Sequence, residues 1–248
     1  MRYFIEVAYR GTNYSGWQIQ KNKFSIQAEL NDAVSTVFNE KIACTGAGRT
    51  DTGVHAIQSY AHFDALNEIP EGFLKRVNSL LPPDIAIRKL MLVHSDAHAR
   101  YDATERSYKY YLHYDKDPFL FDKSFFFPYL PLDLEKVYAA TDLLLEFKDF
   151  APLSKRNNQV KTTLCDIYKA KWETIPDDKG LIFHISANRF LRGMVRRIVG
   201  ALLMIGKEKI TIEEFKLAMQ QKKPLRINIS VPPQGLFLNS VKYPYINQ

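Results

Sequence analysis

Apolar residues recur with two different spacings along the first hundred positions, and each spacing predicts a type of element. Alternating or continuous runs of β-branched and aromatic residues indicate strands. Apolar residues three and four positions apart indicate helices, one starting after a capping serine and one at a proline. The polar loop at 10–23 is expected to expose Tyr14 and Trp17. The predicted elements are a strand at 2–9, a helix after Ser25, strands at 41–45 and 54–64, a helix from Pro70 to before Pro82-Pro83, and a strand at 85–94.

The second half of the chain repeats this order of elements with one helix added. No repeat of the sequence itself is visible, so the duplication is inferred from the architecture alone. Each half has the βαββαβ order of a ferredoxin-like fold. The predicted elements are a strand at 104–114, a helix at 133–145, strands at 162–175 and 181–187, helices at 189–205 and 212–221, and a strand at 236–243.

These patterns predict an α+β protein made of two ferredoxin-like halves, 1–103 and 104–248. A βαββαβ unit places both helices on one face of an antiparallel sheet. Two such sheets lying side by side leave a cleft between the halves, and ligand sites favour such junctions. We therefore expect the functional site to lie in this cleft.

Charge and composition narrow the classes of partner. The 248 residues include 34 Lys and Arg against 27 Asp and Glu, which gives a formal charge of +7. A basic excess of this size is compatible with a polyanionic partner, so we expect the cleft to be basic. The hydrophobic content of 46% is typical of a globular protein. No apolar stretch approaches the length of a membrane span, and we expect a cytoplasmic protein without membrane contact.

Glycines are concentrated between the second and third predicted strands. Gly46, Gly48 and Gly53 surround Arg49 and Asp51, and glycine permits close approach of the backbone to a ligand. A loop held by two strands is a place where a rigid scaffold presents reactive groups. We interpret Asp51 as a reactive carboxylate and Arg49 as its cationic neighbour. The alternative is that Asp51 is a turn residue that bonds its own backbone.

A second candidate surface lies on the predicted strand at 104–114. Arg106, Tyr108 and Tyr110 share one of its faces, because side chains alternate along a strand. A cation beside aromatic rings on a sheet face is how proteins hold single-stranded bases, through stacking and attraction to phosphate. The alternative is packing of these rings against neighbouring strands, with the Arg106 side chain extended along them.

The third candidate is the predicted helix at 189–205. Helical spacing places Arg189, Arg192 and Arg196 on one stripe. Apolar residues flank this stripe closely, so we expect the helix to be largely buried and its arginines to face binding partners. A solvated arginine face is the alternative.

Metal and nucleotide sites find little support in the sequence. Gly46-Ala47-Gly48 lacks the third glycine of the dinucleotide-binding motif, and neither a GxxxxGK[ST] loop nor an HExxH helix occurs. The two cysteines form no CxxC pair. Asp51, His55 and His62 are conceivable metal ligands, but no second dense cluster accompanies them. We expect no metal.

Three segments together resemble the tRNA pseudouridine synthase A (TruA) family. Weaker similarity elsewhere extends the resemblance over nearly the whole chain, in order. The three segments are Gly48–Ala56, Arg106–Tyr110 and Phe190–Gly200, and the weaker ones are Tyr14–Gln18, His98–Arg100, Asp149-Phe150 and Pro232–Tyr243.

The resemblance implies an isomerase that converts uridine to pseudouridine at positions 38–40 of the tRNA anticodon stem-loop, as a homodimer and without metal or cofactor. Asp51 matches the family's catalytic nucleophile, and Tyr108 matches the tyrosine that lies against the target base. Arg196 matches the arginine that pairs with the catalytic carboxylate. Arg49 matches an arginine tied to base flipping and tRNA contact, and Arg100 matches one that touches the tRNA backbone.

Two further arginines, Arg106 and Arg192, are added to the substrate-binding residues on the patterns described above. Thr52 stands where alanine is commoner in the family, and Ala151-Pro152-Leu153 replaces a Ser/Thr-rich segment. Contacts made by the divergent 151–160 loop are therefore the least transferable.

Two other functions are open, a non-catalytic RNA-binding protein of the same sheet architecture and a metal-dependent nuclease. Against pure binding, a carboxylate in a cationic cleft would repel phosphate.

Overall fold

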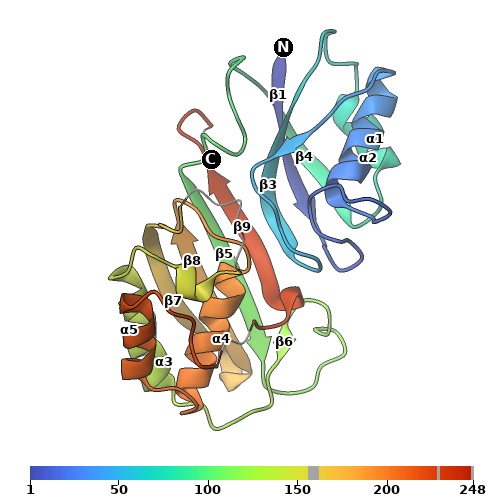
Figure 1. Ribbon diagram of the computed structural model, residues 1–248. Helices are drawn as coiled ribbons and strands as arrows, with labels where there is room; N and C mark the ends of the chain where they lie inside the picture. The colour runs from blue at the N-terminus through green and yellow to red at the C-terminus, as the bar shows by residue number, and fades with distance from the viewer. Residues whose placement is uncertain (156–161, 228–229, 247–248) are drawn as a thin grey trace. The chain divides into compact units, whose positions relative to one another are not determined.

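The computed structural model describes residues 1–155, 162–227 and 230–246 (Figure 1). The fold is mixed α+β with mostly antiparallel strand pairs, as the sequence predicts. The chain divides into two compact units, Met1–Thr104 with Phe237–Gln248, and Glu105–Leu236. The finer prediction, two complete ferredoxin-like halves at 1–103 and 104–248, stays a prediction.

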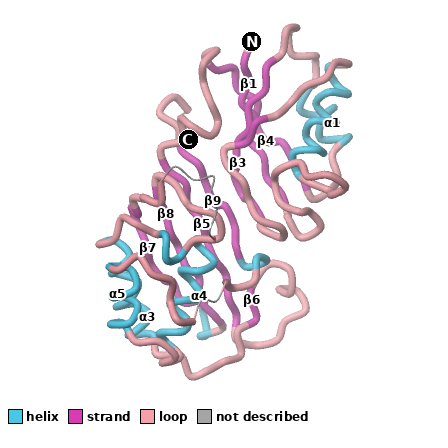
Figure 2. Tube along the Cα trace, viewed as in Figure 1, coloured by secondary structure: helices cyan, strands magenta, loops and turns pink. Residues whose placement is uncertain are grey.

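The first unit is a sheet with two helices, and Figure 2 shows the helices grouped beside the strands. Strands β4, β1 and β3 pair antiparallel in that order, and β2 pairs with β3. Strand β9 runs parallel to β3 where Phe237 and Leu238 pair with His55 and Ala56. The elements are β1 (Arg2–Tyr9), α1 (Ile26–Phe38), β2 (Thr45–Gly46), β3 (His55–Asp64), α2 (Phe73–Leu80), β4 (Ile85–Val93) and β9 (Leu236–Lys242).

Both faces of this first sheet are covered. On one face, Phe38 of α1 contacts Phe63 of β3 and Phe73 of α2, with ring centroids 5.8 and 5.7 Å apart. On the other face, Phe4 of β1 contacts His62 and Tyr243, with centroids 5.9 and 5.3 Å apart. The central strands are therefore buried on both sides and form a rigid support for the loops at their ends.

In the described residues of the second unit, strands β5, β8 and β7 pair antiparallel in that order and are accompanied by the α-helices α3, α4 and α5. The short strand β6 runs parallel to β5. Trp172 of β7 packs on Phe183 of β8 and donates its indole N–H to Thr141 Oγ1 of α3 at 3.0 Å. The elements are β5 (Glu105–His113), β6 (Phe125–Phe126), α3 (Leu134–Asp142), β7 (Ile167–Ile175), β8 (Gly180–Ala187), α4 (Met194–Gly206) and α5 (Ile212–Gln220).

Several predicted elements differ at their ends from the structure. The helix expected to start at Pro70 begins at Phe73, after the N-cap Gly72, and the helix expected at 133–145 is α-helical only as far as Asp142. The strand expected at 41–45 is reduced to the two residues of β2, and the one expected from 162 begins at Ile167. The helix expected at 189–205 begins only at Met194. Its N-cap is Gly193, whose φ of 69° lies in the left-handed region that interrupts a right-handed helix. Among the helices of the described residues, none combines the length and the apolar composition that spanning a bilayer requires.

Candidate active site

The loop that carries Asp51 connects β2 to β3 and is hydrogen-bonded at both ends. Ala47 N–H donates to Tyr60 O at 2.7 Å, and Val54 N–H donates to Asp51 O at 3.2 Å, which closes a turn. Asp51 is half-buried, whereas Arg49 is exposed. The turn fixes the backbone on the C-terminal side of Asp51 and so restricts where its carboxylate can lie.

The polar loop after β1 packs directly against this turn. Trp17 N–H donates to Thr50 O at 3.2 Å, and Gly53 N–H donates to Tyr14 O at 3.4 Å. Gly16 is required here, because a Cβ at this position would lie 2.4 Å from Thr50 O. The predicted exposure of Tyr14 and Trp17 is wrong, since they are 6% and 3% exposed.

His55, a conceivable metal ligand in the sequence, uses its ring to hold neighbouring segments of the first unit. Its Nδ1 accepts the Gly11 N–H at 3.1 Å, and its ring stacks on Phe237 with centroids 4.5 Å apart. His62 Nδ1 likewise accepts a backbone N–H, from Ala99 at 3.2 Å. Among the residues that the structure describes, no group of three or more His, Cys, Asp and Glu could hold a metal ion.

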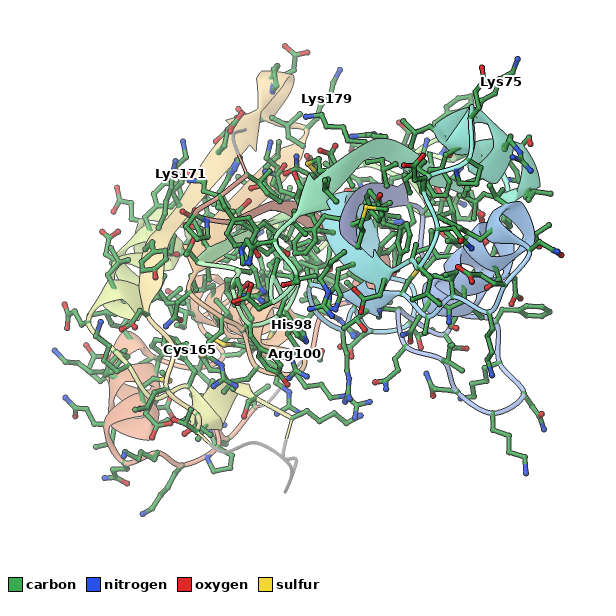
Figure 3. All side chains as sticks on the ribbon, turned by 90° about the horizontal axis from the view of Figure 1, so that it is seen from above. Lys75, His98, Arg100, Cys165, Lys171 and Lys179 are labelled. Atoms are coloured by element: carbon green, nitrogen blue, oxygen red, sulfur yellow. The ribbon has the colours of Figure 1, made fainter. Side chains whose placement is uncertain are left out.

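Arg100 lies on a rigid turn in the first unit, next to His98 (Figure 3). His98 N–H donates to Asp102 Oδ2 at 2.7 Å, and Tyr245 donates its hydroxyl to the same oxygen at 2.8 Å. The Arg100 guanidinium lies 5.6 Å from the centroid of the exposed Tyr101 ring. The turn therefore presents a cation and an aromatic ring on a fixed backbone, an arrangement suited to RNA.

On β5, the side chains of Arg106, Tyr108 and Tyr110 share one face but differ in burial, because Tyr110 is buried and the other two are half-buried. Tyr110 is fully buried and donates its hydroxyl to Pro232 O at 2.8 Å, and burial raises its pKa. Tyr108 is half-buried and packs edge-on against Phe190 with centroids 5.1 Å apart. Arg106 Nη1 donates to Asn188 O at 2.9 Å. Tyr110 is thus a core residue, and Tyr108 is the better placed of the two rings to meet a base.

The predicted arginine stripe on one helix is wrong, because Arg189 and Arg192 precede α4. Arg192 is exposed, and its carbonyl accepts the Lys155 N–H at 2.9 Å. Arg196 lies in the first turn of α4, where its Nε donates to Val231 O at 2.7 Å. Burial, with the neighbouring charge of Arg196, lowers the pKa of Arg197.

Each unit thus positions its own part of the predicted site. Residues Ala151–Leu153 of the divergent loop form a short 3-10 helix, whereas its residues 156–160 lie outside the described part. The candidates on the first unit are Arg49, Asp51 and Arg100, and those on the second are Arg106, Tyr108, Arg192 and Arg196.

Comparison with known proteins gives one consistent result. The family model described as tRNA pseudouridine synthase matches residues 5–102 and 144–244. This range includes Asp51 and Arg196, whereas Tyr108 lies outside it.

Relatives named tRNA pseudouridine synthase A match almost the full chain. The one from Bacteroides thetaiotaomicron is 44% identical over 246 residues, which cover 98% of this chain and 91% of the relative. The one from Azobacteroides pseudotrichonymphae is 42% identical, with 98% and 97% covered. A more distant one from Gloeobacter violaceus is 35% identical, with 98% and 80% covered.

Proposed function

This chain belongs to the tRNA pseudouridine synthase family and is an isomerase, and we propose that it converts uridine to pseudouridine at positions 38–40 of the tRNA anticodon stem-loop, with Asp51 as the nucleophile. The observation that carries the proposal is the position of Asp51. It is half-buried on a loop that is hydrogen-bonded on both sides and lies inside the matched range.

The reaction rearranges one nucleotide without adding or removing an atom overall. The C1′–N1 bond breaks, the uracil rotates, and a C1′–C5 bond forms, with the C5 proton leaving and N1 gaining one. A carboxylate beside C1′ can form a covalent intermediate and so divide this exchange into two easier steps. The rearrangement involves no change of redox state and therefore needs no redox cofactor; that no metal takes part stays a prediction.

The other candidates have roles around this nucleophile. To Arg196 we assign the role of orienting the Asp51 carboxylate through charge-assisted hydrogen bonds. Extruding a base from its stack costs a few kcal/mol, and stacking on Tyr108 offsets part of that cost. Arg49 occupies the space that the base leaves. An RNA-bound structure with Asp51 and Arg196 more than about 8 Å apart would contradict the pairing.

Affinity for tRNA comes mainly from phosphate contacts. Arg100, Arg106 and Arg192 are the cations that we assign to this contact, because a guanidinium binds phosphate through two hydrogen bonds. That each half of the chain is a complete ferredoxin-like unit is part of the same proposal. The homodimer and the cytoplasmic location are further parts of the proposal that rest on family resemblance.

The decisive experiment follows tritium release from an unmodified tRNA transcript that contains 5-³H-uridine, with a chelator present. Wild-type protein is expected to release tritium from positions 38–40, because isomerisation replaces the C5–H bond. Asp51→Asn keeps the size of the side chain but removes the nucleophile, so release is expected to fall below detection while tRNA binding is kept. Asp32→Asn, an exposed position on α1, is the matched control.

Two outcomes would contradict the proposal. Binding of tRNA by both proteins with isomerisation by neither would favour the non-catalytic RNA-binding function. Activity that disappears with chelator and returns with a divalent ion would favour metal-dependent chemistry.

A further inference from the structure

We infer that Tyr9 is a positioning residue for Asp51, acting through the side chain of Thr50. This inference rests on the proposed role of Asp51 as the nucleophile. It assigns to the end of β1 a part in the reaction beyond the packing of the sheet.

The contact between the two side chains is short and shielded from water. The Tyr9 hydroxyl and Thr50 Oγ1 are 2.9 Å apart. Tyr9 is 4% exposed and Thr50 is 9% exposed. A buried hydrogen bond meets little competition from water, so it restrains the position of Thr50 more than a surface contact would.

Thr50 is also fixed through its main chain. Its carbonyl accepts the Trp17 N–H at 3.2 Å, and the Trp17 ring lies 6.0 Å from the ring of Tyr9. The side chain and the carbonyl of Thr50 are therefore held by two residues of one packed group. Asp51 follows at once, and its own carbonyl accepts the Val54 N–H. The backbone is thus fixed on each side of the nucleophile.

Strand pairing at the end of β1 is irregular at this point. Val7 pairs with Ser59, but Tyr9 pairs with Ala56, so Ile57 and Gln58 lie opposite the single residue Ala8. A bulge of this kind redirects neighbouring side chains and is frequent beside active sites. The extra residue lies on β3, opposite Ala8, so the irregularity immediately precedes Tyr9, whose hydroxyl contacts Thr50 of the loop.

The chemical consequence concerns rate rather than binding. The loop can still close without the hydroxyl contact, but Thr50 and Asp51 then have more freedom. A misplacement of about 1 Å at a reacting group lowers a rate by up to about a hundredfold. Tyr9 does not touch the substrate in this scheme, so the affinity for tRNA is expected to be nearly unchanged.

The test measures kcat and KM for an unmodified tRNA transcript. Tyr9→Phe and Thr50→Val each remove one partner of the contact with little change of volume. Each is expected to lower kcat about tenfold and to change KM by less than about twofold. Thr50→Ser keeps the hydroxyl and is expected to retain most of the rate. Because both changes remove the same contact, the double variant should be no slower than the slower single variant.

A matched control separates positioning from general loss of stability. Tyr60 is also a buried tyrosine of the first unit, and its hydroxyl donates to Glu6 Oε2 at 3.2 Å. Tyr60→Phe removes a comparable hydrogen bond and is expected to leave kcat unchanged. All variants are assayed at the same interval below their melting temperatures, so that each is fully folded.

Wild-type kcat in Tyr9→Phe would overturn the inference, and so would an equal loss of kcat in Tyr60→Phe or additive losses in the double variant. Asp51→Asn belongs in the same series. An active Asp51→Asn would overturn the proposed function itself. An inactive Asp51→Asn beside a fully active Tyr9→Phe would remove the positioning role alone.

Discussion

At the scale of single residues, His62 shows how burial sets the charge of a side chain. It is 6% exposed, on the central strand β3. Burial, with the positive charges of His98 and Arg2, lowers its pKa from 6.5 to about 4, although Asp64 and Asp102 act in the opposite direction. His62 is therefore neutral at physiological pH, as its acceptance of the Ala99 N–H at Nδ1 requires.

This lowered pKa predicts a loss of stability on acidification. As the pH falls below 6.5, the unfolded chain protonates at His62 before the folded chain does, so the free energy of unfolding decreases until about pH 4. We expect about 2 kcal/mol of this contribution to be lost between pH 7 and pH 5. Urea unfolding at these two pH values measures it.

His62→Asn is the control for that measurement, because its side-chain oxygen can replace Nδ1 as the acceptor and does not titrate. The difference between the two pH values should be smaller in His62→Asn by about 2 kcal/mol. The same pH dependence in both proteins would show that other groups cause it.

The sequence could mark Asp51 as a candidate, but it could not predict which residues hold the loop that carries it. Three glycines beside a carboxylate mark a special loop whatever the surrounding fold. Tyr14 and Trp17 lie in a polar segment without periodicity, so the local pattern predicts exposure. Their burial depends on where that segment packs, which a tertiary contact decides and a periodicity does not show.

At the scale of elements, the start of α4 shows the same limit. Apolar spacing from Arg189 onward is typical of a helix, and one glycine inside such a pattern is tolerated. Gly193 instead adopts a left-handed conformation, and the helix begins after it. The cap of α1 could be predicted, since Ser25 Oγ accepts the Ala28 N–H, because a capping residue acts within its own first turn.

The conformation of Gly193 can be tested by the sign of one substitution. In a left-handed position, Gly193→Ala is expected to destabilise the protein by about 1 kcal/mol. Inside a helix, the same change would stabilise it by about 1 kcal/mol. Gly193→Asn should fall between alanine and wild type, because asparagine tolerates the left-handed region. Urea unfolding at neutral pH distinguishes a left-handed Gly193 from a helical one. A stabilising effect of Gly193→Ala would support the helix predicted from Arg189 onward.

At the scale of the whole molecule, strand pairing between distant segments sets the fold, and the total charge sets the class of binding partner. The sequence predicts strand β9 within 236–243, but its partner β3 lies about 180 residues away in the chain. No local pattern specifies a partner at such a distance, so the order of elements alone places this strand with the second half. The composition, in contrast, depends on no pairing, and the formal charge of +7 favours a polyanion.

The last prediction concerns how this charge binds tRNA. Each phosphate contact releases counterions, so the logarithm of Kd rises linearly with the logarithm of salt concentration, by about 0.7–0.9 per contact. If Arg100 binds a phosphate, Arg100→Ala should weaken binding and lower this slope by about 1. Lys75 is exposed on α2 and has no role in the proposed site, so Lys75→Ala should keep the wild-type slope (Figure 3). Kd values for one transcript between about 50 and 200 mM salt provide the slopes. Parallel lines for all three proteins would remove Arg100 from the phosphate contacts, whereas a reduced slope in Lys75→Ala as well would mean that tRNA responds to total charge rather than to a defined surface.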